Sequence, residues 1–450
     1  MVLLAYNVST NVSYKNIILV IASLVFYAWG EPVWVILLII SATTDYIHGL
    51  IIGRYRNERQ GIARAALISS LVINLGLLVV FKYSGFIIEN INSFTGLSLA
   101  VPAITLPIGI SFYTFQTLSY TIDVYRGEVR TQKSFLSFFT YVSMFPQLVA
   151  GPIVRYRDIS KSLYKRRTSA DDFAVGSRKF VCGLCKKVLL ANNAGAAADV
   201  LLSGIQVTTL SSWLGAIFFT FQIYFDFSGY SDMAIGLGRM FGFKFKENFE
   251  HPYISRSVTE FWRRWHISLS SFFRDYVYIP LGGNRKHQIL NLLIVWLLTG
   301  LWHGASWNFI LWGLFYGILL IIEKKFIGGR LQRIPFPFCH IYTMLIVIVG
   351  WVIFYFTDLE SMKIYLLSMA GVGCSPYDLV SISKLYQNVW LLAMCVIASL
   401  PVPKLLYNHL SEKLPVFGTI LEGFVIIAGF GLCFIMLTGQ TYNPFLYFRF

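Results

Sequence analysis

Long apolar stretches recur along the whole chain, and they constrain its fold more than any other feature of the sequence. A helix needs about 20 mainly apolar residues to cross the hydrocarbon core of a bilayer, which is about 30 Å thick. We therefore predict roughly ten or eleven tilted transmembrane helices, with the short ones re-entrant or strongly tilted. The candidate spans are Asn16–Tyr27, Trp34–Ile52, Ala63–Phe81, Ile104–Val124, Phe135–Val149, Lys179–Ala191, Trp213–Leu237, Leu290–Ile322 in two pieces, Ile341–Phe356, Val389–Leu406 and Ile420–Leu437.

The composition agrees with an all-α polytopic membrane protein. Hydrophobic residues make up 56% of the chain and charged residues only 13%, whereas an average soluble domain is about 25% charged. Long apolar runs exclude a β-barrel, whose strands read as alternating segments of about 10 residues. We see no internal repeat, which argues against a transporter built from inverted repeats.

The formal net charge of +15 comes from short basic clusters between the apolar runs. Basic loops of this kind mark the cytosolic side of a membrane protein. We therefore expect anionic membrane lipid, and not nucleic acid, near these residues. The clusters are Arg54/Arg56/Arg59, Lys165/Arg166/Arg167, Lys186/Lys187 and Lys324/Lys325.

The segment 291–323 is too long to be one straight transmembrane helix. It would measure about 50 Å at 1.5 Å per residue, so it must break or tilt steeply. Gly300 and Gly304 flank His303 and are the natural place for the break. Irregular backbone at membrane depth is tolerated only where protein or a water-filled cavity surrounds it. We therefore expect His303 to face a cavity.

His303 is the first candidate for a catalytic residue. An ionisable side chain inside an apolar span is costly and indicates function, and a neutral imidazole can accept a proton at neutral pH. The alternative is a histidine that only binds a carbonyl of a neighbouring helix. No G-x-S-x-G motif occurs, so the nucleophile would be a hydroxyl of the substrate. We expect Trp302 and Asn308, which lie on the same segment, to contact the substrate.

Lys244–Asn284 combines charge with aromatic residues and is too polar to cross lipid. Residues 258–276 are predicted to form a helix at the interface or dipping into the protein, with Glu260 and Arg264 paired across one turn. His266 in this segment is the second candidate site residue, most simply one that orients substrate. A metal site and an interfacial histidine without a role are the alternatives.

We expect no metal cofactor in this chain. No H-E-x-x-H motif occurs, and no third ligand accompanies the two candidate histidines. Cys182 and Cys185 form a C-x-x-C without a second ligand pair. We interpret these two cysteines as helix residues one turn apart.

Two carboxylates interrupt the apolar stretch around residues 224–232. Asp226 and Asp232 are expensive to bury unless they are paired, and we expect Arg239, Arg263 or Arg264 as partners. These aspartates, with Tyr230 between them, either fix helix packing or contact the substrate.

Basic residues gather around the His266 segment and form a positive cytosolic mouth. Such a mouth attracts an anionic donor, such as a nucleotide-linked thioester or an acidic carrier protein, and Arg263 is our candidate for that contact. Binding of anionic lipid headgroups is the alternative. The basic residues are Lys244, Lys246, Arg256, Arg263, Arg264 and Arg274.

At these residues the sequence resembles the membrane-bound O-acyltransferase (MBOAT) family, closest to the bacterial branch of alginate O-acetyltransferase membrane subunits. The resemblance follows the chain in order. Its motifs are Leu106–Gln116 (LPIGISFYTFQ), Met144–Arg155 (MFPQLVAGPIVR), Phe225–Asp232 (FDFSGYSD), Glu260–Leu269 (EFWRRWHISL), Gly300–Gly304 (GLWHG) and Tyr442–Phe445 (YNPF).

The resemblance implies that an acyl group moves from a cytosolic thioester, acetyl-CoA or an acyl carrier protein, to a hydroxyl. His303 matches the family's catalytic histidine and His266 its second active-site histidine. The implied fold is a ring of tilted helices around a central funnel in the bacterial plasma membrane. Such members work with a periplasmic or surface-anchored SGNH-type partner on a polysaccharide, and a related member uses a carrier protein to D-alanylate teichoic acid.

We predict a single membrane domain over residues 1–450, with N-terminal helices over 16–81, a catalytic core over about 104–323 and C-terminal helices over 341–437. Family members usually have a further apolar helix before Ala28–Pro32, of which only Val2–Tyr6 is present here. The competing functions are a transporter or flippase of an acylated carrier, and a structural subunit whose partner holds the chemistry.

Overall fold

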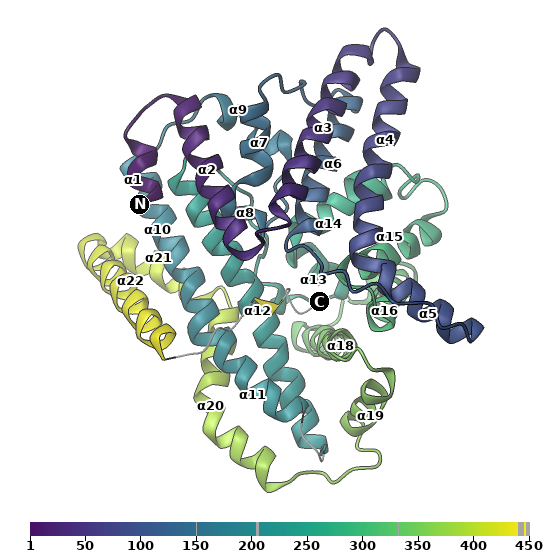
Figure 1. Cartoon of the computed structure of the whole chain (residues 1–450). Coiled ribbons are helices and arrows are strands. Elements are labelled where there is room, and N and C mark those ends of the chain that lie inside the picture. The colour runs from purple at the N-terminus through teal and green to yellow at the C-terminus, as the bar shows by residue number, and fades with distance from the viewer. Residues whose placement is uncertain (150, 204–206, 332, 440–444, 447–450) are drawn as a thin grey trace. The chain divides into compact units, whose positions relative to one another are not determined.

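The computed structural model describes residues 1–149, 151–203, 207–331, 333–439 and 445–446. Within these residues every regular element is a helix, as predicted (Figure 1). The chain divides into two compact units. The first unit comprises Met1–Lys179 and Ala234–Lys246, and the second comprises Phe180–Met233 and Glu247–Phe450. The ring-and-funnel arrangement and the single-domain boundaries stay predictions.

The first unit is built from short and long helices that pack around buried aromatic residues. At its centre, the Tyr120 ring lies 4.7 Å from Phe138 and 4.9 Å from Tyr156, centroid to centroid. The helices are α1 (Val2–Asn7), α2 (Val12–Gly30), α3 (Val35–Tyr55), α4 (Gln60–Leu78), η1 (Val79–Tyr83), α5 (Ser84–Thr95), α6 (Ile110–Arg126), α7 (Phe135–Ser143), α8 (Phe145–Leu148) and α9 (Tyr156–Tyr164).

Helices α3, α4 and α6 lie side by side in the first unit (Figure 1). Asp45 of α3 is fully buried among them and accepts hydrogen bonds from Ser70 Oγ at 2.6 Å and from Asn74 Nδ2 at 2.8 Å. A buried carboxylate needs such donors to offset its lost hydration.

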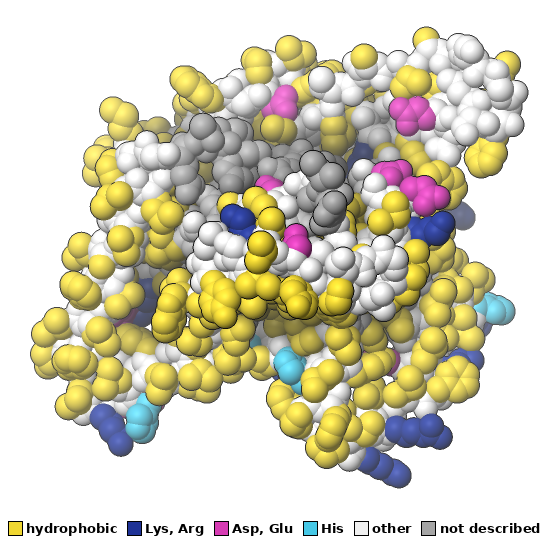
Figure 2. Space-filling view, turned by 90° about the horizontal axis from the view of Figure 1, so that it is seen from below, with side chains coloured by type: hydrophobic (Ala, Val, Ile, Leu, Met, Phe, Trp, Pro, Cys, Tyr) yellow, Lys and Arg dark blue, Asp and Glu magenta, His cyan; other side chains and the backbone are white. Residues whose placement is uncertain are grey.

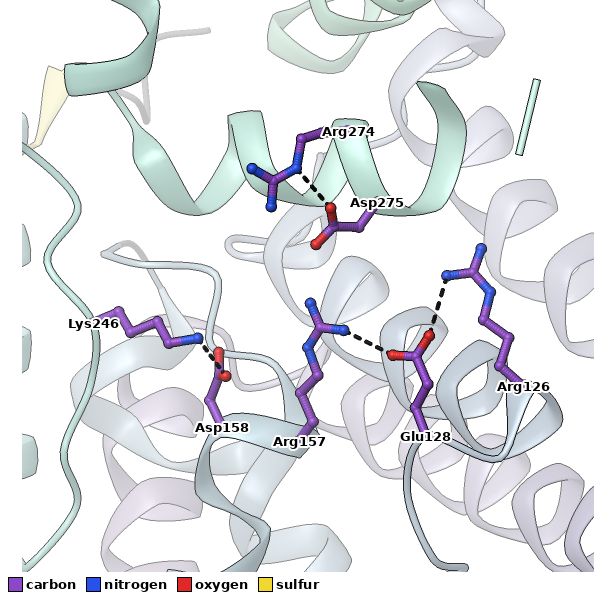
Figure 3. Close-up of polar contacts among 7 residues, drawn as sticks. All are labelled: Arg126, Glu128, Arg157, Asp158, Lys246, Arg274 and Asp275. Atoms are coloured by element: carbon purple, nitrogen blue, oxygen red, sulfur yellow. Dashed lines mark hydrogen bonds and ion pairs between the residues drawn. The ribbon is translucent and has the colours of Figure 1, made fainter. Parts of the chain in front are cut away.

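Two ion pairs of the first unit join its loops to the short helix α9 (Figure 3). Glu128 accepts from Arg157 at 2.8 Å, and Asp158 accepts from Lys246 at 2.6 Å. Exposed pairs of this kind contribute little to stability, typically about 0 to 1 kcal/mol each.

Helices α10 (Ala170–Cys185) and α12 (Thr209–Met240) contribute residues to both units. Cys182 and Cys185 lie one turn apart on α10, which confirms their interpretation as helix residues. The other helices of the second unit are η2 (Lys186–Ala191), α11 (Asn192–Leu202), η3 (Pro252–Ile254), α13 (Val258–Arg264), α14 (Ile267–Phe273), η4 (Arg274–Tyr278), α15 (Gln288–His303), α16 (Trp307–Ile322), η5 (Glu323–Ile327), α17 (Gly328–Leu331), α18 (Phe336–Tyr355), α19 (Leu359–Met369), α20 (Leu379–Ser399), α21 (Val402–Lys413) and α22 (Pro415–Thr438).

Six helices of the described residues are long and apolar enough to cross a membrane. This is fewer than the ten or eleven crossings expected, because helices surrounded by protein are shorter and more polar than lipid-facing ones. In α6, for example, almost every side chain is buried, including Gln116 and Asp123. The six are Val12–Gly30, Val35–Tyr55, Gln60–Thr95, Phe336–Tyr355, Leu379–Ser399 and Pro415–Thr438.

Several of these helices expose apolar side chains, as lipid contact requires. Only 6% of the most apolar window of α22 is buried. Figure 2 shows one face of the chain, on which hydrophobic side chains form broad areas and charged side chains are few and scattered. The chain is therefore a multi-pass membrane protein.

Candidate active site

Helices α15 and α16 form a tight hairpin that positions His303. A Cβ on Gly300 would meet the Phe309 carbonyl oxygen at 2.3 Å, and one on Gly313 would meet the Trp296 carbonyl oxygen at 2.4 Å. The two backbones can approach this closely only because both positions are glycine. The predicted break lies at Gly304–Ser306, directly after His303, and Gly300 serves the helix contact instead.

His303 ends α15 and is buried, with only 6% of its surface exposed. Its ring is surrounded by aromatic rings: Trp302 and Trp312 lie 5.0 Å away and Phe354 lies 5.1 Å away, centroid to centroid. His303 also lines the cavity described below, as the sequence predicted.

The segment 258–276 forms two short helices and not the single helix that we predicted. Helix α13 ends at Arg264, and α14 begins at Ile267. Between them His266 adopts the left-handed region, with φ of 43°, which is uncommon for a residue other than glycine. This reversal turns the imidazole inward, so that only 1% of His266 is exposed.

Glu323, which the sequence analysis did not select, holds the start of α13. Its carboxylate accepts the backbone N–H groups of Val258 at 2.7 Å and Thr259 at 2.8 Å. A carboxylate at a helix N-terminus satisfies orphan donors and complements the helix dipole. The contact joins η5 to the helix that precedes His266.

His266 has one ring nitrogen bound and one unpaired. Its Nδ1 lies 3.1 Å from Asn248 Oδ1, whereas Nε2 is buried without a hydrogen-bond partner among the described residues. Burial lowers the pKa of His266 to about 3, so the ring is neutral at physiological pH. Asn248 was missed because nothing in the sequence distinguishes it from other loop asparagines.

One cavity in the second unit, of about 1170 Å³, is lined by both histidines. Trp302, which is not itself among the residues that line the cavity, packs against both histidines: its ring centroid is 5.8 Å from that of His266 and 5.0 Å from that of His303. A cavity of this size can hold a small-molecule substrate. Four basic residues also line it, namely Arg256, Arg263, Arg274 and Lys324.

Three of the basic residues that line the cavity, Arg256, Arg263 and Lys324, have no acidic partner among the ion pairs of the described residues. Arg264 pairs with Glu260 at 2.9 Å, as predicted, and Arg274 pairs with Asp275 at 2.7 Å (Figure 3). Arg263 and Lys324, in contrast, lie close to each other. Burial, and then the charge of Arg263, lower the pKa of Lys324.

Asp226 and Asp232 pair with lysines of η2, which corrects the expectation of arginine partners. Lys187 binds Asp226, and Lys186 binds Asp232 at 2.7 Å. The reason is a close approach of α10 to α12, where a Cβ on Gly183 would meet the Gly229 carbonyl oxygen at 2.4 Å. Of the three expected arginines, Arg239 binds Asp172 and Arg264 binds Glu260 instead.

The remaining predicted substrate contacts lie apart from the cavity lining. Asn308 is fully buried and donates from Nδ2 to the Phe354 carbonyl oxygen at 2.8 Å, which joins α16 to α18. Tyr230 packs 5.1 Å from the Phe445 ring. Among the described residues, no group of three His, Cys, Asp or Glu side chains is arranged to hold a metal ion.

Comparison with known proteins agrees with the site. The profile of the MBOAT, membrane-bound O-acyltransferase family, matches residues 96–366. This chain belongs to the MBOAT family. The matched region contains both cavity histidines, so the chain is a membrane-bound O-acyltransferase. Of the motifs quoted above, Ala150 and Tyr442–Pro444 lie outside the described residues.

Individual MBOAT relatives show which enzymes the chain is similar to. It is 41% identical to a probable alginate O-acetylase of Pseudomonas aeruginosa, over 89% of this chain and 79% of the relative. It is 35% identical to a peptidoglycan O-acetyltransferase of Helicobacter pylori, over 81% of this chain and 75% of the relative. A teichoic acid D-alanyltransferase of Bacillus subtilis is 30% identical to it, over 49% of this chain and 59% of the relative.

Proposed function

We propose that this MBOAT protein moves an acetyl group from a cytosolic thioester to a hydroxyl destined for an extracytoplasmic polysaccharide, in the bacterial plasma membrane. One observation carries the proposal: His303 and His266 line the same cavity, together with basic residues that have no acidic partner among the described ion pairs. The acetyl group and the polysaccharide follow the names of the alginate and peptidoglycan relatives.

The donor is an acyl thioester, acetyl-CoA or an acyl carrier protein. Both carry phosphate, and the Arg263–Lys324 pair at the cavity would gain from an anion between its two positive charges. Burial, and then the positive charge of Arg263, lower the pKa of Lys324, which supports this assignment. No tightly bound cofactor is needed for the reaction.

His303 acts as the general base. It accepts the proton of the acceptor hydroxyl while the oxygen attacks the thioester carbonyl carbon. The tetrahedral intermediate then collapses, the carbon–sulfur bond breaks, and the leaving thiolate takes the proton back from the imidazolium. General base catalysis supplies about 10²- to 10⁴-fold, and orientation of the two substrates supplies much of the remainder.

His266 orients the acceptor hydroxyl, and Trp302 packs against both histidines. The unpaired and neutral Nε2 of His266 can accept a hydrogen bond, which supports this role. Asp226, Tyr230 and Asp232 are better explained by helix packing, which was the alternative in the sequence analysis. Asn308, which we expected to contact the substrate, is also better explained by helix packing. A periplasmic SGNH-type partner would complete transfer to the polysaccharide.

The second candidate is D-alanyl transfer from a carrier protein, which the teichoic acid D-alanyltransferase relative supports. A transporter or flippase is disfavoured because the family catalyses acyl transfer. The purified protein in lipid nanodiscs, given acetyl-CoA and an alcohol acceptor, should release free thiol. Thiol release only from a D-alanyl carrier protein would favour the second candidate.

The role of His303 is tested in the same assay. His303→Ala should abolish thiol release, while His409→Ala, an exposed histidine of α21, should retain it. Both proteins are first shown to be folded and inserted by size-exclusion chromatography and thermal unfolding. Wild-type turnover by folded His303→Ala protein would remove His303 from the mechanism.

A further inference from the structure

We propose that Asn248 is a positioning residue that holds His266 in the Nδ1-protonated tautomer, so that Nε2 accepts a hydrogen bond from the substrate. This inference rests on the role proposed for His266. A loop asparagine thereby determines which ring nitrogen of His266 contacts the substrate.

The orientation of the Asn248 amide is set by a backbone donor. The Ser268 N–H group lies 3.2 Å from Asn248 Oδ1, and the Ser268 hydroxyl lies 2.8 Å from the same oxygen. A backbone N–H can only donate, so the amide atom that faces it must be the carbonyl oxygen. A flipped amide would bring two donors together.

The opposite end of the amide agrees with this orientation. Asn248 Nδ2 donates to Ser231 Oγ of α12 at 3.1 Å. Both Asn248 and Ser231 are 1% exposed, so neither end of the amide is free to exchange its partner for bulk water. The amide therefore has one orientation in which all its described contacts are satisfied.

The tautomer of His266 follows from that orientation. Asn248 Oδ1 is only an acceptor, so the Nδ1 atom 3.1 Å away must carry the proton. In a neutral imidazole the other nitrogen is then an acceptor. Nε2 is that nitrogen, and it is buried and unpaired on a residue that lines the cavity. A hydroxyl in the cavity is the matching donor.

One further polar group, Ser268 Oγ, lies 3.3 Å from Nδ1. Because this hydroxyl donates to Asn248 Oδ1, it can only accept from Nδ1 and favours the same tautomer. The aromatic neighbours of the His266 ring do not compete for the proton. They are Phe227 of α12 at 4.6 Å, Phe249 at 6.5 Å and Trp302 of α15 at 5.8 Å, centroid to centroid. Burial is the cause of the lowered pKa of His266. The asparagine amide, together with the Ser268 hydroxyl that donates to it, thus distinguishes the two nitrogens.

Side-chain variants of Asn248 can separate this role from a general structural one. The Asn248 backbone carbonyl accepts from Ile267 N–H at 2.9 Å, and this contact survives any change of the side chain. Asn248→Leu removes the acceptor, whereas Asn248→Asp keeps it. Asn388→Leu is the matched control, since this half-buried asparagine of α20 donates to the Lys384 carbonyl oxygen in its own helix.

In thiol-release assays, Asn248→Leu should lower kcat by about 10- to 100-fold, the usual range for loss of a residue that orients a functional histidine. KM for the thioester should stay within about twofold. Asn248→Asp should recover most of kcat. A carboxylate beside Nδ1 raises the pKa of His266. As the pH is lowered, Asn248→Asp should therefore lose activity at a higher pH than the wild type does.

Several outcomes would overturn the inference. Wild-type kcat in Asn248→Leu, with loss of activity in His266→Ala, rejects the role of Asn248 but leaves the proposed function intact. If Asn248→Leu and Asn248→Asp lose kcat equally and the pH profile is unchanged, Asn248 has only a structural role. Wild-type activity in His266→Ala rejects the proposed role of His266 itself, and with it this inference.

A measurement on the unaltered protein decides the question where the variants do not fold. In ¹⁵N-histidine-labelled protein in lipid, solid-state NMR distinguishes protonated Nδ1 from protonated Nε2. The His266 signals are assigned by their loss in His266→Gln. A protonated Nδ1 supports the inference, and a protonated Nε2 overturns it.

Discussion

The ring of Trp302 lies 5.8 Å from that of His266 and 5.0 Å from that of His303, the residue that follows Trp302 in the chain. His266, in the turn between α13 and α14, and His303, at the end of α15, thus line one cavity and contact the same indole ring. A buried side chain in this position sets the distance between the two imidazoles, and so the distance between a base and the hydroxyl that it must deprotonate.

Trp302→Ala should therefore lower kcat more than Trp302→Phe. Displacing a catalytic group by about 1 Å can reduce the rate by about 10²-fold, and the alanine leaves room for both histidines to move. We expect a loss of about 10²-fold in Trp302→Ala and a smaller loss in Trp302→Phe, measured as thiol release. Equal activity of the two variants would contradict the spacing role.

The glycine contact between α15 and α16 should not tolerate a methyl group. Gly313→Ala would bring a Cβ to 2.4 Å from the Trp296 carbonyl oxygen, so the hairpin must open. Overpacking of this kind typically costs about 1 to 3 kcal/mol, and we expect a lower thermal midpoint together with reduced kcat. Gly423→Ala on α22, where nothing lies within 4 Å, is the control and should leave both unchanged.

Removal of Arg263 should weaken donor binding with little effect on chemistry. Arg263→Gln should raise KM for the thioester by about tenfold, equivalent to about 1.4 kcal/mol, and should reduce the dependence of KM on salt. Initial rates at several salt concentrations measure both. Arg64→Gln, at an exposed arginine of α4, is the control. An unchanged KM in Arg263→Gln would exclude a donor anion at this position.

The Lys187–Asp226 pair should behave as a buried ion pair. The Asp226 side chain is only 2% exposed, and Lys187→Met removes its lysine partner. This substitution should destabilise the protein by about 3 kcal/mol. The double variant Lys187→Met/Asp226→Asn should recover much of that loss, because the buried charge is removed as well. Thermal unfolding in detergent compares the variants. A double variant less stable than Lys187→Met would contradict this account.

Some features of the site could be predicted because they depend on residues that are near one another in the sequence. The helix break after His303 follows from the length of the apolar run and from Gly304, and the Glu260–Arg264 pair follows from helical spacing. The all-α membrane class follows from composition and from the length of the apolar stretches. The family motifs also identified both histidines.

Other features depend on contacts between distant segments, which no local pattern encodes. Glu323 binds the start of α13, and Asn248 binds His266 only because the chain reverses at His266 and brings the loop back to α14. The partners of Asp226 and Asp232 were predicted wrongly because the glycine contact between α10 and α12 decides which cations are near. Charge and hydropathy along a sequence determine which residues must be buried and paired. The tertiary packing decides which residues become their partners, because a hydrogen bond or an ion pair depends on distances of a few ångströms.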